Sequence, residues 1–212
     1  MRITALQPHH RNPERVHVHV DGQPRLTLSA ELVLTLGLHV GDEVDEARLE
    51  ELERRDQPWR AREAALSLLS YRPRSAAELR RRLARKGFDA EVVDACVEAL
   101  GGVGVVDDAA FAESLVRDRV RLRPQGRRRI RQELRAKGVD EETASAAIDE
   151  VMEGEDASEI DLARAAAARW KPRPGEERDR ARRRLHAFLA RRGFGGDAVR
   201  AVLAEKLDSG GG

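Results

Sequence analysis

The chain has 212 residues, and because only 3% of them are aromatic, leucine, valine and alanine must supply most of any core. Charged residues make up 36%, yet 39 basic and 38 acidic side chains leave a net charge of only +1, so nucleic-acid binding must rest on local charge. One cysteine excludes an internal disulfide, and the absence of a leader or an 18-residue apolar run predicts a cytoplasmic protein with no membrane contact.

Residues 1–58 are expected to form a small α+β N-terminal module with a β-hairpin. Residues 15–20 alternate strictly between polar and apolar, and Asp21-Gly22 marks the turn that follows. Asp56-Gln57-Pro58 is expected to end a helix and the module, because proline disfavours helix in the residue before it. The expected elements are strands at 1–6, 15–20 and 25–29 and helices at 30–36 and 45–55.

Five of the six histidines lie in this module: His9, His10, His17, His19 and His39. His17 and His19 share one strand face, where a metal ion is conceivable, but no carboxylate or cysteine set accompanies them, so a plain strand face is the preferred interpretation. The glycine cluster at 101–104 lacks the lysine and hydroxyl residue of a phosphate loop. No catalytic residue, metal site or cofactor is predicted.

The rest of the chain repeats one pattern three times. Leu83-Ala-Arg-Lys-Gly87-Phe88 returns as Leu134-Arg-Ala-Lys-Gly138-Val139 and as Leu189-Ala-Arg-Arg-Gly193-Phe194. In each copy an apolar residue precedes the leucine by four positions, which places both on one helix face. The glycine is expected to end the helix in the left-handed conformation, so alanine at each of the three glycines should cost about 1 kcal/mol.

An amphipathic helix is expected before and after each of these middle helices, giving three-helix repeats. Ser75-x-x-Glu78 is a capping box for the first middle helix, and Asp107-Asp108 is expected to cap the first helix of the second repeat. The sequence predicts a mainly α fold, a tandem array of three three-helix repeats preceded by the small α+β module. The predicted repeats span 59–106, 107–154 and 155–207, and a disordered tail is expected at 208–212.

Basic residues gather on the middle helices, whereas the third helices of the first two repeats are acidic. At about 100° per residue, the side opposite the buried leucines carries arginines that could meet phosphate or clustered carboxylates. The alternative is a solvated helix face. Only Trp59, Tyr71 and Trp170 are candidates for stacking on bases, so backbone or acidic-surface contact is preferred to base reading. The predicted partner-binding residues are Arg81, Arg85, Arg128, Arg129, Arg135, Arg183, Arg184 and Arg191.

Three segments together resemble the RecX family of recombinase regulators. They are Ser75-x-x-Glu78-Leu79-x-x-x-Leu83-x-x-Lys86-Gly87-Phe88, Asp107-Asp108-x-x-Phe111-Ala112-Glu113 and Gly126-x-x-Arg129-Ile130-x-x-Glu133-Leu134-x-x-Lys137-Gly138. The resemblance covers residues 60–207. The third repeat departs most, with Ala181 where the cap is expected and His186 at a basic position.

The resemblance implies a non-enzymatic bacterial regulator that binds RecA filaments on DNA. It also implies suppression of RecA ATP hydrolysis, strand exchange and co-protease activity, and so a role in homologous recombination, DNA repair and the SOS response. The protein is expected to be a monomer, and direct contact with single- or double-stranded DNA stays open. The rival hypothesis is a general helical-repeat DNA-binding protein without a recombinase partner.

Overall fold

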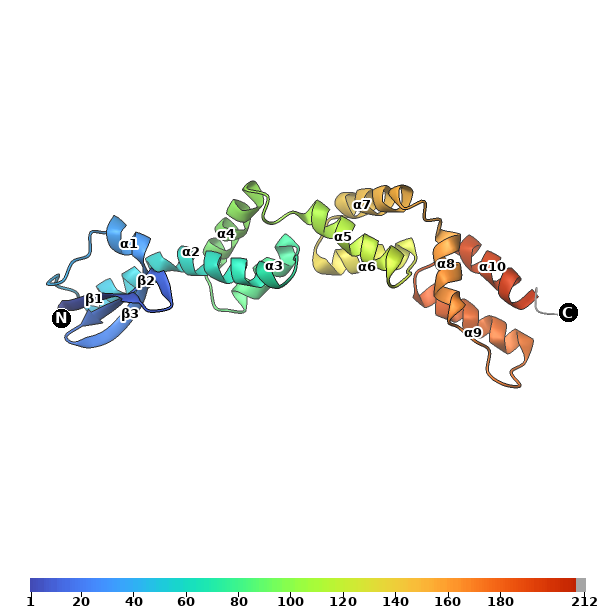
Figure 1. Cartoon of the computed structure of the whole chain (residues 1–212), viewed down its shortest axis with the longest axis horizontal. Helices are drawn as coiled ribbons and strands as arrows, with labels where there is room; N and C mark the ends of the chain where they lie inside the picture. Colours follow the sequence, from blue (N-terminus) through green and yellow to red (C-terminus); the bar gives the residue numbers. More distant parts are fainter. Residues whose placement is uncertain (209–212) are drawn as a thin grey trace. The chain divides into compact units, whose positions relative to one another are not determined.

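The computed structural model describes residues 1–208, apart from the side chain of Asp208, and is mainly helical with a small sheet (Figure 1). The predicted fold class is confirmed. Of the predicted tail at 208–212, only Asp208 is described, and it ends the last helix. The chain forms two compact units, of which unit 1 comprises Met1–Arg72 and Leu79–Gly102, and unit 2 comprises Pro73–Glu78 and the residues from Val103 onward.

Unit 1 begins with an antiparallel sheet whose order is β1-β2-β3. The strands are β1 (Ile3–His9), β2 (Asn12–Val20) and β3 (Gln23–Ser29). Asp21 and Gly22 both have positive φ, 49° and 82°, as the tight turn between β2 and β3 requires. Val18 and Leu28 are completely buried on one face of the sheet, so the polar-apolar alternation of the sequence correctly identified its strands and its inner face.

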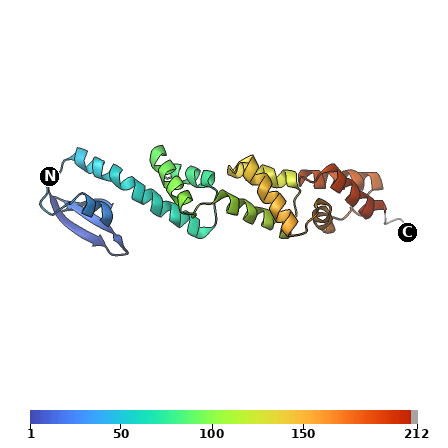
Figure 2. The ribbon, with the colours of Figure 1, turned by 90° about the horizontal axis from the view of Figure 1, so that it is seen from above.

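Two helices pack against the sheet, α1 (Ala30–Thr35) and α2 (Glu46–Tyr71). The expected helix break at residues 56–58 is wrong, because α2 runs through Pro58 without interruption (Figure 2). Before the proline, α2 buries Leu49, Leu52 and Asp56, whereas after it α2 buries Ala61 and Ala65. From residue 56 to 61 is about 500° of rotation, so the buried face changes by roughly 140° at the proline. That change of face resembles a helix end in the sequence.

The remaining helices follow the predicted three-helix pattern. They are α3 (Ala76–Ala84), α4 (Ala90–Gly102), α5 (Asp108–Arg121), α6 (Arg127–Lys137), α7 (Glu141–Gly154), α8 (Glu159–Ala168), α9 (Arg178–Arg191), α10 (Gly196–Leu203) and η1 (Ala204–Asp208). In unit 2, α5 packs on α6 and α7, and α8 packs on α9 and α10. One apolar core runs through both groups. The residue boundaries of the module and of the repeats stay predictions.

The predicted glycine stop is present at the end of every middle helix. Gly87, Gly138 and Gly193 have φ of 87°, 85° and 80°, which is the left-handed region. At Gly138 the next amide, Val139 N, donates to the Leu134 carbonyl at 3.1 Å, the bond that defines this helix ending. The corresponding bond after Gly193 is 3.3 Å long. These endings are local, which is why sequence spacing predicted them.

In unit 2, the start of one middle helix meets the end of the next. The Ser75 hydroxyl, at the start of α3, donates to the Lys137 carbonyl at the end of α6 over 2.6 Å. At the equivalent place, Gly126 N, at the start of α6, donates to the Arg192 carbonyl just after α9 over 2.9 Å. Free amides and hydroxyls at a helix start thus satisfy free carbonyls at a helix end. The second and third repeats also share an apolar core.

Three capping details differ from expectation or extend it. Asp107 caps α5 as predicted, but Asp108 accepts from Ala76 N at 2.8 Å and so caps α3 instead. Ser75 accepts from Glu78 N at 3.1 Å, which confirms that half of the capping box. Ala181 does not cap α9, because this helix begins earlier, at Arg178, and buries Ala181. A buried apolar side chain replaces a cap at this position.

Candidate partner-binding surface

The middle helices have a buried side and a basic side. Leu83, Leu134 and Leu189 are completely buried, as are the apolar residues four positions before them. The only acidic residue of α6, Glu133, is partly buried and pairs with Arg119 of α5, so the exposed side of α6 is basic. The helix period therefore separates core residues from cationic ones, as the sequence predicted.

Seven of the eight predicted partner-binding arginines are exposed, and Arg184 is the exception. The Arg184 side chain is only 34% exposed, is paired with Glu176, and lies over the ring of Trp170 with its central carbon 5.5 Å from the centroid. Arg184 therefore holds the segment after α8 against α9. Among residues 1–208, those of the set without an ion pair are Arg81, Arg85, Arg128, Arg129, Arg135, Arg183 and Arg191.

Other arginines of the middle helices are neutralised inside the protein. Arg80 of α3 pairs with Asp94 of α4 at 2.9 Å, and Arg131 of α6 pairs with Glu141 of α7 at 2.8 Å. Arg127 also pairs with α7, through Asp149. In the first two repeats the acidic third helix thus compensates one side of the basic middle helix. Exposed pairs of this kind contribute little to stability, but they direct the uncompensated charge to the remaining side.

The second repeat carries the adjacent pair Arg128 and Arg129 at the start of α6. Both side chains are exposed, and the Arg129 guanidinium contacts only Gln132, at 3.1 Å, among the side chains described. The backbone of Arg129, in contrast, packs directly on Gly193 of the third repeat. A substitution can therefore reverse the charge at 128 and 129 while it preserves the junction between repeats.

A buried ionic cluster supports the first junction. Arg74 and Glu78 are both only 7% exposed and their side chains pair at 2.5 Å, while Lys137 Nζ lies 3.4 Å from the second oxygen of Glu78. Local sequence spacing could not predict this partner of Lys137, because Glu78 lies 59 residues away in the chain.

Acid should weaken unit 2 in particular. Hydrogen bonds from Arg119, Arg121 and Arg164 hold the pKa values of Glu133, Glu155 and Glu205 below their usual range. A carboxyl with a depressed folded-state pKa contributes stability above its unfolded pKa of about 4.3, and that contribution is lost as pH falls through the folded value. The urea concentration at the midpoint of unfolding should therefore decrease as the pH is lowered from 6 to 3. The decrease should be smaller in the Glu133→Gln variant, which lacks one of these carboxyl groups. An unchanged midpoint would contradict these ion pairs.

The residues that the sequence offered as metal ligands, a thiol or stacking aromatics mostly contact other residues of the protein. His17 Nδ1 lies 3.0 Å from Thr27 Oγ1, and in the part of the chain described no group of three or more His, Cys, Asp or Glu side chains could hold a metal ion. Burial raises the pKa of the Cys96 thiol. Arg15 covers the ring of Trp59 at 4.7 Å, whereas Tyr71 is 91% exposed.

Among the described residues 1–208, no helix combines the length and apolarity that crossing a bilayer demands.

The fold and surface define a class of protein: a tandem three-helix-repeat protein with exposed, internally uncompensated arginines on its middle helices. Three family models match the chain, described as the first, second and third three-helix domains of RecX, at residues 61–100, 107–148 and 157–203. The chain belongs to the RecX family.

Relatives named "Regulatory protein RecX" support this membership. The one from Thermobifida fusca is 39% identical over 151 residues, covering 71% of this chain and 80% of the relative. That from Halorhodospira halophila is 44% identical over 148 residues, covering 68% and 86%. A relative from Clostridium botulinum (strain Alaska E43) is 28% identical but spans 98% of this chain and 97% of its own length, so the similarity includes the N-terminal module.

Solved structures support the fold. A crystal structure of regulatory protein RecX superimposes with a TM-score of 0.70 at 23% identity, covering 95% of this chain and 98% of that one. RecX from Lactobacillus salivarius gives 0.57 at 23% identity, covering 73% and 98%.

Proposed function

We propose that this protein regulates the RecA recombinase by binding RecA filaments on DNA and suppressing their ATP hydrolysis, strand exchange and co-protease activity. The observation that carries the proposal is the set of exposed arginines without internal partners on three equivalent helices. Membership of a family of regulatory proteins agrees with it. The proposed mode of action is binding, since these arginines face solvent and can reach an anionic partner.

The chemistry of the surface fits an anionic partner. Only four of the 39 basic residues are lysines, and arginine makes paired hydrogen bonds to carboxylate and phosphate groups that lysine cannot make. A filament of protein on DNA offers both kinds of anion. Repeated helices at a regular chain spacing would bring arginines to successive subunits, which gives multivalent binding without strong individual contacts.

The variant Arg128→Glu/Arg129→Glu tests this surface. We expect its affinity for RecA filaments, measured by fluorescence anisotropy, to fall by a factor of about ten or more, because each substitution removes a charge-assisted contact and adds repulsion. Inhibition of DNA-dependent ATP hydrolysis by RecA should weaken in parallel. Circular dichroism should not change. The matched control is Arg54→Glu/Arg62→Glu, which makes the same charge change on exposed residues of α2.

Full affinity in the folded double variant would reject this surface and leave a solvated helix face. Binding to naked DNA that equals binding to RecA filaments would instead favour a general DNA-binding protein. Salt separates the targets, because contacts with duplex phosphates make log affinity fall linearly with log salt by about 0.9 per contact. The purified protein should hydrolyse no ATP by itself.

A further inference from the structure

Unit 2 contains a cationic cavity that includes none of the eight arginines discussed above. It has a volume of about 690 Å³ and lies among the α5–α6 loop, the end of α8 with the residues after it, and α9. Its wall contains five basic side chains and no carboxylate: Arg121, Arg123, Arg169, Lys171 and Arg192. The size is in the range of ordinary ligand sites.

Four of these charges have no internal counterion. Arg121 pairs with Glu155, but among residues 1–208 the side chains of Arg123, Arg169, Lys171 and Arg192 form no ion pair. All four are exposed, so they can reach a ligand. Cations gathered around a concave surface raise the local concentration of anions more than the same charges spread over a flat face. The occupant must therefore carry several negative charges.

The same cavity has an apolar wall. Leu122, Phe188 and Trp170 contribute to it. Leu122 is 74% exposed although it is a large apolar residue, Phe188 is half-buried, and Trp170 is only 8% exposed. The central carbon of the Arg192 guanidinium lies 3.8 Å from the centre of the Phe188 ring. The Arg184 guanidinium lies over the Trp170 ring. Inorganic phosphate alone would leave this wall unused, so the ligand should have a flat apolar part as well as charge.

The cavity is also held rigidly. The carbonyl of Arg192 accepts from Gly126 N at 2.9 Å, so the α5–α6 loop and the end of α9 are joined by backbone at its edge. Gln125, on the wall beside this junction, has its Oε1 buried with no hydrogen-bond partner in the described part of the chain. A buried acceptor without a donor costs free energy.

We propose that this cavity binds a segment of single-stranded nucleic acid, with a base against Leu122 and Phe188, next to the largely buried Trp170, and flanking phosphates on Arg123, Arg169 and Lys171. Single-strand binders combine cations that follow the backbone with rings that accept unstacked bases. A duplex keeps its bases stacked inside and offers only phosphates to such a wall. The proposal goes beyond the regulation of RecA, because the site acts without the recombinase.

The experiment uses the full chain with Trp59→Phe, so that Trp170 is the only indole, and an oligothymidylate of about 15 nucleotides. Binding should quench Trp170 fluorescence. Arg123→Ala/Lys171→Ala should weaken binding by about tenfold or more and lower the salt slope by about 1.4, which is 0.7 for each lost contact on a single strand. The control Arg180→Ala/Arg200→Ala removes the same charge from exposed residues of the third repeat outside the cavity and should bind normally.

Other ligands identify which part of the oligomer the cavity recognises. An abasic oligomer of the same length, or a duplex, should bind more weakly and quench less if a base occupies the apolar wall. Equal binding by the three would reduce the site to a phosphate-binding surface and overturn the proposal. Polyglutamate that quenches Trp170 and competes as well as the oligomer would identify a site for acidic protein instead. If the protein fails to regulate RecA while the oligothymidylate still quenches Trp170 fluorescence, only the function proposed for the middle-helix arginines is rejected.

Discussion

Gly126→Ala is expected to destabilise unit 2 by about 3 kcal/mol or more, which corresponds to a fall of roughly 6–12 °C in Tm for a chain of this size. The new Cβ would overlap backbone atoms of Gly193 and Phe194, which cannot rotate away as a side chain could. The junction would have to open, and the hydrogen bond from Gly126 N to the Arg192 carbonyl would be lost. Thermal unfolding followed by circular dichroism measures the effect.

Gly154→Ala is the matched control. This glycine ends α7, has no positive φ, and has nothing within 4 Å of the position of an added Cβ. Its substitution should leave Tm unchanged or slightly higher, because alanine is the better helix former. Equal Tm values for the 126 and 154 variants would show that the two backbones do not touch as described.

The same contact corrects the expectation that the three stop glycines are equivalent. A Cβ at Gly87 meets nothing within 4 Å, so Gly87→Ala should cost only the left-handed strain of about 1 kcal/mol. A Cβ at Gly193 would also overlap the backbone of Arg129. Gly193→Ala should therefore be clearly more destabilising than Gly87→Ala, although both glycines occupy the same position in the repeat.

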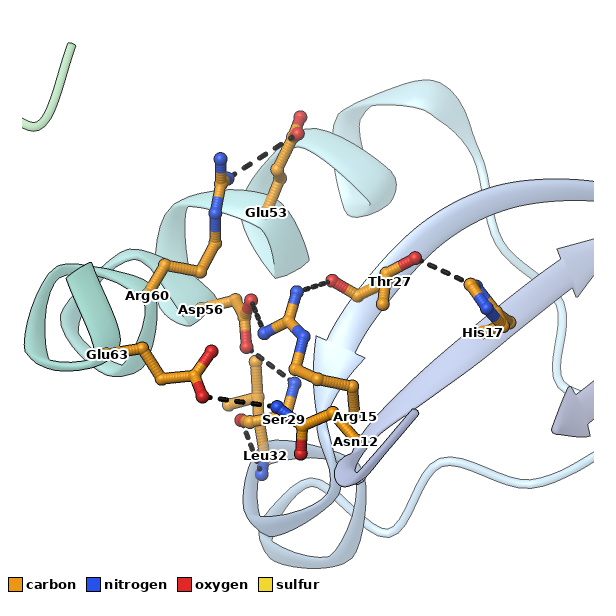
Figure 3. A network of polar contacts seen from close by, with 10 residues as sticks. All are labelled: Asn12, Arg15, His17, Thr27, Ser29, Leu32, Glu53, Asp56, Arg60 and Glu63. Carbon is orange, nitrogen blue, oxygen red and sulfur yellow. Dashed lines mark hydrogen bonds and ion pairs between the residues drawn. The ribbon is translucent and has the colours of Figure 1, made fainter. Parts of the chain in front are cut away.

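Asp56→Ala is expected to cost about 3–5 kcal/mol in unit 1, the usual effect of removing one partner of a buried charge pair. The Asp56 carboxylate, 1% exposed, accepts from Arg15 Nη1 and from Ser29 N, both at 2.7 Å (Figure 3). Arg15 also donates to the Thr27 carbonyl, so strands β2 and β3 are both tied to α2 here. Alanine would leave the Arg15 charge and the Ser29 amide without this acceptor. Urea unfolding measures the loss.

Glu53→Ala serves as the control for this network. Glu53 lies one turn earlier on α2, is 61% exposed, and approaches its partner Arg60 only to 3.9 Å (Figure 3). An exposed pair of this length should contribute less than about 0.5 kcal/mol. If both variants unfold at the same urea concentration, the buried pair does not anchor α2 to the sheet.

Local patterns explain what could be predicted from the sequence. Strands β2 and β3, the leucines of the middle helices and the glycine stops all depend on residues within a few positions of one another, so their spacing determines the structure. The helix through Pro58 was missed because the proline predicts the end of a helix, whereas α2 continues through it. Propensity was overruled by packing on both sides of the proline.

Long-range contacts explain what could not be predicted. Arg15 and Asp56 are 41 residues apart, and no local pattern connects them. The cationic cavity is assembled from three segments, of which Arg123 and Lys171 follow different helices. Of the partner-binding candidates, Arg184 looked equivalent to Arg183 until folding placed Glu176 beside it. The function of the remaining arginines stays a prediction.

The uninterrupted helix α2 also limits how this chain can change length. Leu52 and Ala61 belong to two different buried faces of one helix, so the number of residues between them sets the angle between those faces. One inserted residue would rotate one face by about 100° against the other, whereas seven would restore the angle to within about 20°. Insertions and deletions near Pro58 should therefore be accepted in steps of about seven residues. The same step applies in a coiled coil, although α2 is a single helix.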